Sequence, residues 1–347
     1  MKTNIELVDS PHGEITVYTL VNANGGIVKL SSLGAGILSI VVPDRDGRMA
    51  DVALGYGNPV DYFYDGPCAG KVPGRYANRI ARGHLEIDGK VYQLNINNGP
   101  NALHGGPENF AQKIWDCEMA GDSVVFSLES PDGDEHYPGN VNARVEYTWT
   151  DDNVLKIALG AVSDSKTVVN LTNHCYFNLA GEDSGSVLDH VLQLNCSRWL
   201  PTDDTLIPTG EIAPVEGTPM DFLTAKPLGR DIKQDFPALK YGKGYDNCWM
   251  IDDADGENVR LCATLSDPRS GRVLNVLTNQ PAVQVYTGNW LDGCPKSKSG
   301  KNYHDYDGVA IECQGAPDAP NHPDFPSQFL DSDGEYRRVI FFEFTTK

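Results

Sequence analysis

Residues 141–162, Val-Asn-Ala-Arg-Val-Glu-Tyr-Thr-Trp-Thr-Asp-Asp-Asn-Val-Leu-Lys-Ile-Ala-Leu-Gly-Ala-Val, are the stretch that decides the fold class. Apolar and polar side chains alternate in both halves, and Asp151-Asp152-Asn153 between them favours a turn. A period of two is that of a β-strand with one buried face, whereas an amphipathic helix needs a period near 3.6. The stretch therefore predicts an antiparallel β-hairpin.

The same period recurs along the chain, and helical periodicity is scarce. A second hairpin is predicted over 84–96, with Asp88-Gly89 as its turn. Short helical turns are predicted only at 109–115 and 237–239. Further strands are predicted at 14–21, 27–42 (broken near Gly34 and Gly36), 123–129, 168–179, 187–194, 259–266, 272–278, 282–287, 309–313 and 338–345.

This pattern predicts an all-β protein, a large antiparallel β-sandwich with few short helices. The chain has 35 glycines and 22 prolines, so its loops must be numerous. No low-complexity linker and no internal repeat divides it. We therefore expect a single domain over residues 1–347.

The amino-acid composition limits the kinds of molecule that this protein is expected to bind. The formal net charge is −20, which repels phosphate backbones and anionic membranes, so neither nucleic acid nor a membrane is an expected partner. The N-terminus lacks the apolar segment of a signal peptide, and no apolar run is long enough to span a bilayer. The eight cysteines form no CxxC pair, which favours free thiols in a reducing cytoplasm.

The segment 309–323, Val-Ala-Ile-Glu-Cys-Gln-Gly-Ala-Pro-Asp-Ala-Pro-Asn-His-Pro, is the first candidate site. An apolar strand carries a carboxylate, Glu312, and is followed by a loop that its prolines make rigid. Burying an ionised carboxylate is costly unless it is paired or used, so Glu312 is a candidate functional group. The alternative is an edge strand whose last residue has reached water.

Three short motifs carry further polar groups. The segment 74–81, Gly-Arg-Tyr-Ala-Asn-Arg-Ile-Ala, offers Asn78 and Arg79, whose amide and guanidinium suit sugar hydroxyls or surface salt bridges. His104 precedes two glycines in a loop, where the backbone can approach a ligand closely. His174, in the aromatic and amide-rich segment 172–179, is a candidate proton donor or a satisfied core histidine.

Asp246 lies among aromatic residues, and Gln284 lies on the strand face opposite Val283 and Val285, where a buried amide needs partners. Planar polar groups together with aromatic platforms are what a sugar site requires. Platforms for the C–H faces of a sugar are expected among Tyr176, Phe177, Tyr245 and Trp249. No GxSxG nucleophile motif and no phosphate loop is present.

Taken together, four motifs resemble those of the aldose 1-epimerase (galactose mutarotase) family and occur in that family's order. They are the segments 74–81, 103–106 (Leu-His-Gly-Gly), 172–179 (Thr-Asn-His-Cys-Tyr-Phe-Asn-Leu) and 312–321 (Glu-Cys-Gln-Gly-Ala-Pro-Asp-Ala-Pro-Asn). The resemblance runs from about Gly34 to the C-terminus. It implies a β-supersandwich and the interconversion of α and β anomers of free aldohexoses, with no cofactor or metal.

Position within the matching motifs implies the role of each residue. Glu312 resembles the family's general base and His174 its general acid. The implied sugar-binding residues are Asn78, Arg79, His104, Asp246 and Gln284. The expected partner is a monosaccharide, and the expected assembly is a monomer or a homodimer. The chain departs from the pattern at 71–73, where Lys-Val-Pro precedes the Gly-Arg pair.

Three alternatives stay open on the sequence. A lectin-like sugar-binding module would use the same aromatics and amides, but it would not need a carboxylate and an imidazole together. A cupin-like metalloenzyme could use His104, His174 and Glu312 as metal ligands, although no His-x-His spacing is present. A hexose-6-phosphate epimerase would need clustered basic residues, for which Arg75, Arg79 and Arg82 lie close in sequence. The preferred sugar is not indicated.

Overall fold

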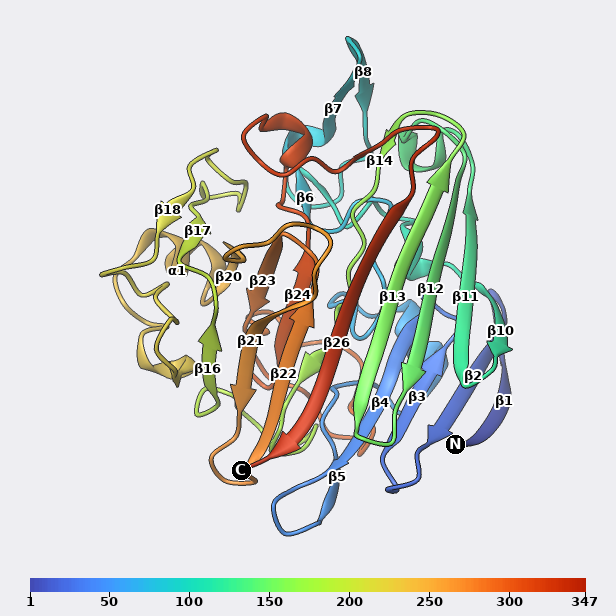
Figure 1. Ribbon diagram of the computed structural model, residues 1–347, viewed down its shortest axis with the longest axis vertical. Coiled ribbons are helices and arrows are strands. Elements are labelled where there is room, and N and C mark those ends of the chain that lie inside the picture. The colour runs from blue at the N-terminus through green and yellow to red at the C-terminus, as the bar shows by residue number, and fades with distance from the viewer.

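The computed structural model covers residues 1–347 and consists mainly of antiparallel strands (Figure 1). The predicted hairpin at 141–162 is confirmed as β12 (Val141–Trp149) and β13 (Val154–Ser163), which pair from Val141 with Ser163 to Trp149 with Leu155. These two strands lie inside a nine-stranded sheet that crosses the molecule in Figure 1.

The nine-stranded sheet has the order β10-β11-β12-β13-β26-β22-β21-β16-β19. Its remaining strands are β10 (Asp116–Ala120), β11 (Ser123–Ser130), β26 (Tyr336–Thr346), β22 (Arg272–Thr278), β21 (Arg260–Ser266), β16 (Val191–Leu194) and β19 (Lys226–Pro227).

Two further sheets complete the main architecture. A five-stranded sheet contains, in order, β1 (Lys2–Ser10), β2 (Gly13–Val21), β3 (Ile27–Ser31), β4 (Gly36–Pro43) and β5 (Met49–Asp51). A six-stranded sheet has the order β15 (Tyr176–Phe177), β24 (Val309–Gln314), β23 (Ala282–Tyr286), β20 (Asp246–Met250), β17 (Arg198–Leu200) and β18 (Ala213–Pro214).

Short pairs and turns surround the sheets. The two-stranded pairs are β6 (Arg79–Ile80) with β9 (Ala102–Leu103), β7 (His84–Ile87) with β8 (Lys90–Gln93), and β14 (Thr167–Val168) with β25 (Phe329–Leu330). The one α-helix is α1 (Pro237–Gly242), and the 3-10 turns are η1 (Pro59–Phe63), η2 (Ala81–Gly83), η3 (Phe110–Gln112), η4 (Asp134–His136), η5 (Leu228–Arg230) and η6 (Ala319–Asn321).

One large core of 59 buried residues draws side chains from all three sheets. Strand β24 shows how the core positions the functional groups. Val309, Ile311 and Cys313 belong to this core, so the alternation of the strand turns Glu312 to the opposite face. Because β24 is hydrogen-bonded on both sides, to β15 and β23, the alternative of an exposed edge strand is wrong.

Most predicted strands are confirmed, but one is largely wrong. Between 168 and 179 only Val168, the last residue of β14, and Tyr176–Phe177 are in strands. Asn170 and Asn173 explain the difference, because their side-chain amides donate to backbone carbonyls of Ala77 and Gly70 and hold the chain in a non-repeating path. The strand predicted at 187–194 is also shorter, since β16 begins at Val191.

Ten strands escaped prediction. Three have five or more residues, namely β1, β10 and β20, and seven have two or three residues, namely β5, β6, β9, β17, β18, β19 and β25. The apolar residues of β1 carry little burial signal, because Ile5 and Leu7 lie exposed at the margin of the five-stranded sheet. Both predicted helical turns exist, as η3 and α1.

Candidate active site

Six of the seven predicted site residues line a single cavity of about 760 Å³. They come from segments far apart in the sequence: Asn78, Arg79, His104, His174, Asp246 and Glu312. Gln284 is not among the lining residues, but it contacts two of them. It pairs with Glu312 across β23 and β24, and its amide donates to Asp246 Oδ1 at 2.6 Å.

At the floor of the cavity, His174 Nε2 lies 3.5 Å from Glu312 Oε1. Both side chains are almost wholly buried, with Glu312 2% exposed. Glu312 Oε2 and His174 Nδ1 have no hydrogen-bond partner in the protein. Because buried polar atoms are nearly always satisfied, these two atoms mark a place where a ligand's polar groups would bind.

The backbone of His174 is fixed by the neighbouring loop. Its N–H donates to Lys71 O and its C=O accepts from Gly70 N, each at 2.9 Å. The loop is anchored in turn by a fully buried ion pair, in which Lys71 Nζ lies 2.5 Å from Asp65 Oδ1. The lysine stem packs where Gly34 has no side chain, because a Cβ there would lie 2.9 Å from Lys71 Cβ. Within the departure at 71–73, Lys71 thus supports the loop behind His174.

His104 is held in one orientation and one tautomer. Its Nδ1 accepts a hydrogen bond from Asn78 N at 3.1 Å, and its own backbone N–H donates to Asn78 O at 2.9 Å. A neutral imidazole that accepts at Nδ1 carries its proton on Nε2, so His104 can donate that proton to a ligand. The left-handed backbone at His104, with φ of 57°, turns the ring toward His174, and the two ring centroids lie 5.3 Å apart.

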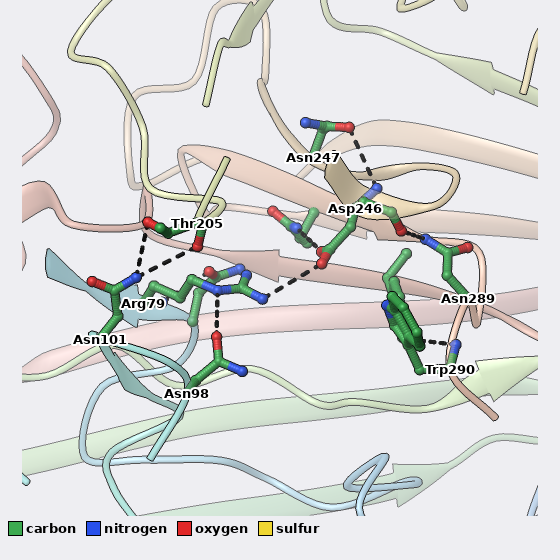
Figure 2. A network of polar contacts seen from close by, with 12 residues as sticks. Arg79, Asn98, Asn101, Thr205, Asp246, Asn247, Asn289 and Trp290 are labelled. Atoms are coloured by element: carbon green, nitrogen blue, oxygen red, sulfur yellow. Dashed lines mark hydrogen bonds and ion pairs between the residues drawn. The ribbon is translucent and has the colours of Figure 1, made fainter. Parts of the chain in front are cut away.

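Arg79 lies between Asn98 and Asp246 (Figure 2), and all three residues line the cavity. Its Nε donates to Asn98 Oδ1 at 3.1 Å, and its terminal nitrogen lies 3.6 Å from Asp246 Oδ2. With Gln284 on the other oxygen of Asp246, the three side chains form a continuous polar network. Rigid planar donors and acceptors of this kind suit the fixed spacing of ring hydroxyls.

Burial dominates the electrostatics of the catalytic candidates. It raises the pKa of Glu312 well above its usual value, with the Asp246 carboxylate acting in the same direction and Arg79 opposing it. It lowers the pKa of His174 to about 4, and it lowers the pKa of His104 well below its usual value. Glu312 is therefore a stronger base, and protonated His174 a stronger acid, than either group in water.

The structure corrects the predicted aromatic platforms. Tyr176 lines the cavity, but Phe177, Tyr245 and Trp249 are fully buried in the core. Phe177 packs against Phe342 from the nine-stranded sheet, with ring centroids 5.0 Å apart. Phe177, Tyr245 and Trp249 have apolar neighbours in sequence. Such neighbours are expected both beside a cavity and in the core, so the sequence did not distinguish the two locations.

The three neighbouring arginines separate in space. Arg75 is buried outside the cavity, where its guanidinium donates to Pro138 O, Gly139 O and Ser130. Arg82 is exposed and lies outside the cavity. Of the three arginines, only Arg79 lines the cavity.

Several cavity residues escaped the sequence analysis, among them Asn98, Tyr286 and Trp290. Asn98 had a usable signal, because Asn-Asn-Gly-Pro at 97–100 is a turn sequence directly before the His104 motif. His104, His174 and Glu312 do not form a metal-binding cluster, since no group of three or more His, Cys, Asp or Glu side chains is arranged to hold an ion. No helix has the length and apolar character needed to cross a membrane.

The sequence is similar to a family model and to proteins of that family over most of its length. The family model described as aldose 1-epimerase matches residues 16–342. Galactose mutarotase of Bos taurus is 43% identical over 318 residues, covering 92% of this chain and 91% of its own. Aldose 1-epimerase of Escherichia coli is 38% identical over 339 residues, covering 96% and 97%.

Solved structures agree with the sequence relatives. The aldose epimerase homologue from C. elegans superposes with a TM-score of 0.87 at 30% identity, over 99% of both chains. Galactose 1-epimerase from Lactobacillus acidophilus gives a TM-score of 0.87 at 29% identity, again over 99% of both chains.

Proposed function

Because the chain belongs to the aldose 1-epimerase family, we propose that it interconverts the α and β anomers of free aldohexoses such as galactose and glucose. The observation that carries the proposal is the buried pair of Glu312 and His174, 3.5 Å apart, each with an unpartnered atom in a cavity lined by sugar-binding groups. One carboxylate and one imidazole are the two proton-transfer groups that this isomerisation needs.

The reaction consists of proton transfers around one bond. Glu312 takes the proton of the C1 hydroxyl while His174 gives a proton to the ring oxygen, and the C1–O5 bond breaks to a free aldehyde. Rotation about C1–C2 presents the other carbonyl face. Reversal of both transfers closes the opposite anomer, so no net proton or electron is left over.

This assignment requires the proton of the pair to lie on His174 when sugar is bound. Burial alone favours the opposite distribution, since it raises the pKa of Glu312 and lowers that of His174. Hydrogen bonds from sugar hydroxyls stabilise the ionised carboxylate and move the proton toward the imidazole. Binding of the sugar would thus prepare both catalytic groups.

The remaining site residues hold the sugar during ring opening. Arg79 and Asp246 bind hydroxyls, and Gln284 supports this binding through its hydrogen bond to Asp246. Asn78 orients His104, and His104 donates from Nε2. These contacts restrict the motion of the open-chain sugar and so favour closure of its ring.

Within the family fold, a hexose 6-phosphate is disfavoured as substrate. Arg79 is the one lysine or arginine that lines the cavity, and it already faces Asp246 and Asn98. A non-catalytic sugar-binding module is disfavoured for another reason: it would gain nothing from burying a carboxylate beside an imidazole, which costs stability.

Polarimetry of freshly dissolved α-D-galactose, with and without the protein, tests the proposal. We expect the approach to the equilibrium rotation to accelerate in proportion to protein concentration, and equally in buffer containing EDTA. An unchanged rate would refute the epimerase activity, and a loss in EDTA that a divalent ion restores would revive a metal site.

The cellular setting is part of the same proposal. Eight free cysteines support a reducing cytoplasm, where the enzyme would serve hexose metabolism as a monomer or homodimer without nucleic acid or membrane partners. Size-exclusion chromatography with light scattering distinguishes the two assemblies.

A further inference from the structure

Asp318 is a buried carboxylate that the proposed mechanism does not use. It lies in the loop after β24, directly before η6, and only 2% of its surface is exposed. It is not among the residues that line the cavity. A carboxylate is costly to bury unless it accepts hydrogen bonds from the protein, so its hydrogen-bond partners indicate its role.

Two partners of Asp318 belong to the segment that carries Arg79. The backbone N–H of Asp318 donates to Arg79 O at 2.8 Å, and Asp318 Oδ1 accepts from Ala81 N at 2.9 Å. One residue therefore holds the backbone on both sides of Ile80, and the loop that follows β24 lies against β6 (Figure 1). We call these two hydrogen bonds the Asp318 clamp.

Strand β6 depends on the Asp318 clamp, because its own strand pairing is minimal. It consists of Arg79 and Ile80 alone, which pair with Leu103 and Ala102 of β9. A ladder of two residues is too short to fix the course of a chain by itself. The Asp318 clamp adds a hydrogen bond at Arg79 O and another at Ala81 N, so it restrains the backbone from which the Arg79 side chain extends.

Asp318 is itself fixed in place. Its backbone has the left-handed conformation, with φ of 56°. Asn321 Nδ2 donates to Asp318 Oδ1 at 2.6 Å, and His322 Nε2 lies 3.2 Å from Asp318 Oδ2. The next residue, Ala319, donates its N–H to the hydroxyl of the fully buried Tyr76 at 3.2 Å. These contacts hold the carboxylate toward the backbone of β6.

A second side chain joins the same two segments. Asn170 Oδ1 accepts from Gly315 N at 2.7 Å, and Asn170 Nδ2 donates to Ala77 O at 3.0 Å. Gly315 directly follows β24, the strand that carries Glu312, and Ala77 lies shortly before β6. The strand of the candidate base and the segment of the candidate sugar-binding arginine are thus joined at two points, by Asn170 and by Asp318.

We propose that Asp318 is a positioning residue, which sets the place of the Arg79 guanidinium relative to Glu312 and thereby the affinity for sugar, without contacting the sugar itself. A guanidinium binds through a rigid fork of donors, so its contribution depends on where the backbone holds it. The inference rests on the proposed function, because that function gives Arg79 its role in sugar binding.

Two variants at position 318 separate the carboxylate from the backbone conformation. Asp318→Gly tolerates the left-handed conformation but has no acceptor for Ala81 N, whereas Asp318→Asn keeps an acceptor oxygen and also suits that conformation. Asp318→Gly should raise KM for galactose by at least about tenfold, the effect expected for loss of a hydrogen bond to a charged group, with a smaller effect on kcat. Asp318→Asn should keep KM within about threefold of the native value.

Asp267 supplies the matched control. It is also a fully buried carboxylate that accepts from a backbone amide, Ser270 N at 2.9 Å, but it lies outside the cavity, between β21 and β22. Asp267→Gly should lower the free energy of unfolding and leave KM for galactose unchanged. A rise in KM equal to that of Asp318→Gly would mean that loss of any buried carboxylate weakens sugar binding, and would overturn the positioning role.

A double-mutant cycle shows whether Asp318 acts through Arg79. In the Arg79→Ala background, Asp318→Gly should lower kcat/KM by less than about twofold, because the side chain that Asp318 positions is absent. Asn321→Ala is a milder change that removes a donor to Asp318 Oδ1. It is measured in both backgrounds by the same criterion, and it replaces Asp318→Gly if that variant does not fold. Equal losses with and without Arg79 would reject the proposal.

The outcomes distinguish this inference from the proposed function. If the native protein does not accelerate the anomerisation of galactose, the proposed function fails and the inference fails with it. If it does, but Asp318→Gly leaves KM unchanged or lowers kcat alone, the positioning role fails while the function stands.

Discussion

At the scale of single residues, the proposed function depends on two side chains that the fold buries at a cost in free energy. Glu312 and His174 each lose solvation, and the unpartnered Glu312 Oε2 and His174 Nδ1 are not compensated within the protein. Such a cost is the usual mark of a site whose partner is a ligand. The motifs at 172–179 and 312–321 identified both residues, but their separation and their pKa directions required the structure.

Substitution of Glu312 tests the base. Glu312→Gln keeps the shape of the side chain but cannot take a proton at neutral pH, so kcat should fall by at least ~10²-fold while sugar binding is largely kept. Polarimetric rates give kcat, and equilibrium titration gives the binding constant. Rates close to those of the native protein would reject Glu312 as the base.

Substitution of His174 and substitution of His104 should affect different kinetic constants. His174 adjoins Glu312, whereas His104 is locked as an Nε2 donor by Asn78. His174→Asn should therefore lower kcat strongly, and His104→Gln should raise KM at least as much as it lowers kcat. Steady-state kinetics of both variants decide the matter, and the reverse pattern would exchange their roles.

At the scale of elements, strands with one buried face were predictable and the paths between them were not. The alternation in 141–162 reports burial directly. The segment 168–179 failed because asparagine side chains, rather than neighbouring strands, satisfy its backbone. The ion pair between Lys71 and Asp65 could not be predicted either, because nothing in the sequence links the two charges or shows that their loop is buried.

Breaking this pair should destabilise the loop behind His174. Lys71→Met leaves Asp65 buried without its partner, and removal of one member of a buried pair typically costs about 3–5 kcal/mol. Urea unfolding measures the loss. The exposed pair Arg48–Asp46 is the control, because Arg48→Met should change the free energy of unfolding by less than about 0.5 kcal/mol.

A double variant completes this test. Lys71→Met combined with Asp65→Leu removes both charges, and it should recover much of the stability lost in Lys71→Met alone. No recovery would mean that the lysine acts through its hydrogen bond to Tyr62 O rather than through the ion pair.

At the scale of the whole molecule, we expect the charge of the protein to favour a neutral substrate. The net charge is −20, and Asp204, Asp246, Asp292 and Glu312 line the cavity against one arginine. A dianionic sugar phosphate therefore meets repulsion both at long range and in the cavity. We expect kcat/KM for galactose or glucose to exceed that for glucose 6-phosphate by at least about tenfold, or ~1.4 kcal/mol. Parallel coupled assays measure this, and a preference for the phosphate would reverse the substrate assignment.

Stability should also depend on pH through a histidine outside the site. Burial lowers the pKa of His190 to about 4, and its Nε2 accepts from Leu179 N at 2.9 Å. Between pH 6.5 and 4 the unfolded chain binds a proton at this residue that the folded protein does not. Its contribution to stability is therefore present near pH 7 and falls as the pH drops through this window.

Comparison with His190→Gln isolates that contribution. The difference in free energy of unfolding, native minus variant, should shrink on acidification by up to about 1.4 kcal/mol per pH unit. Urea titrations at several pH values give the slope, and a difference that does not vary with pH would contradict the assignment.

The alternation of β24 has a consequence for how this protein can change. Ile311 and Cys313 belong to the core and Glu312 to the cavity, so inserting one residue within the strand would exchange their sides and abolish both packing and chemistry. The segment 287–308, which follows β23 and carries Trp290, contains no strand, so a change of length there would not exchange the two faces of a sheet. We therefore expect changes of sugar preference to come from substitutions and insertions in such connecting segments rather than from insertions within β24.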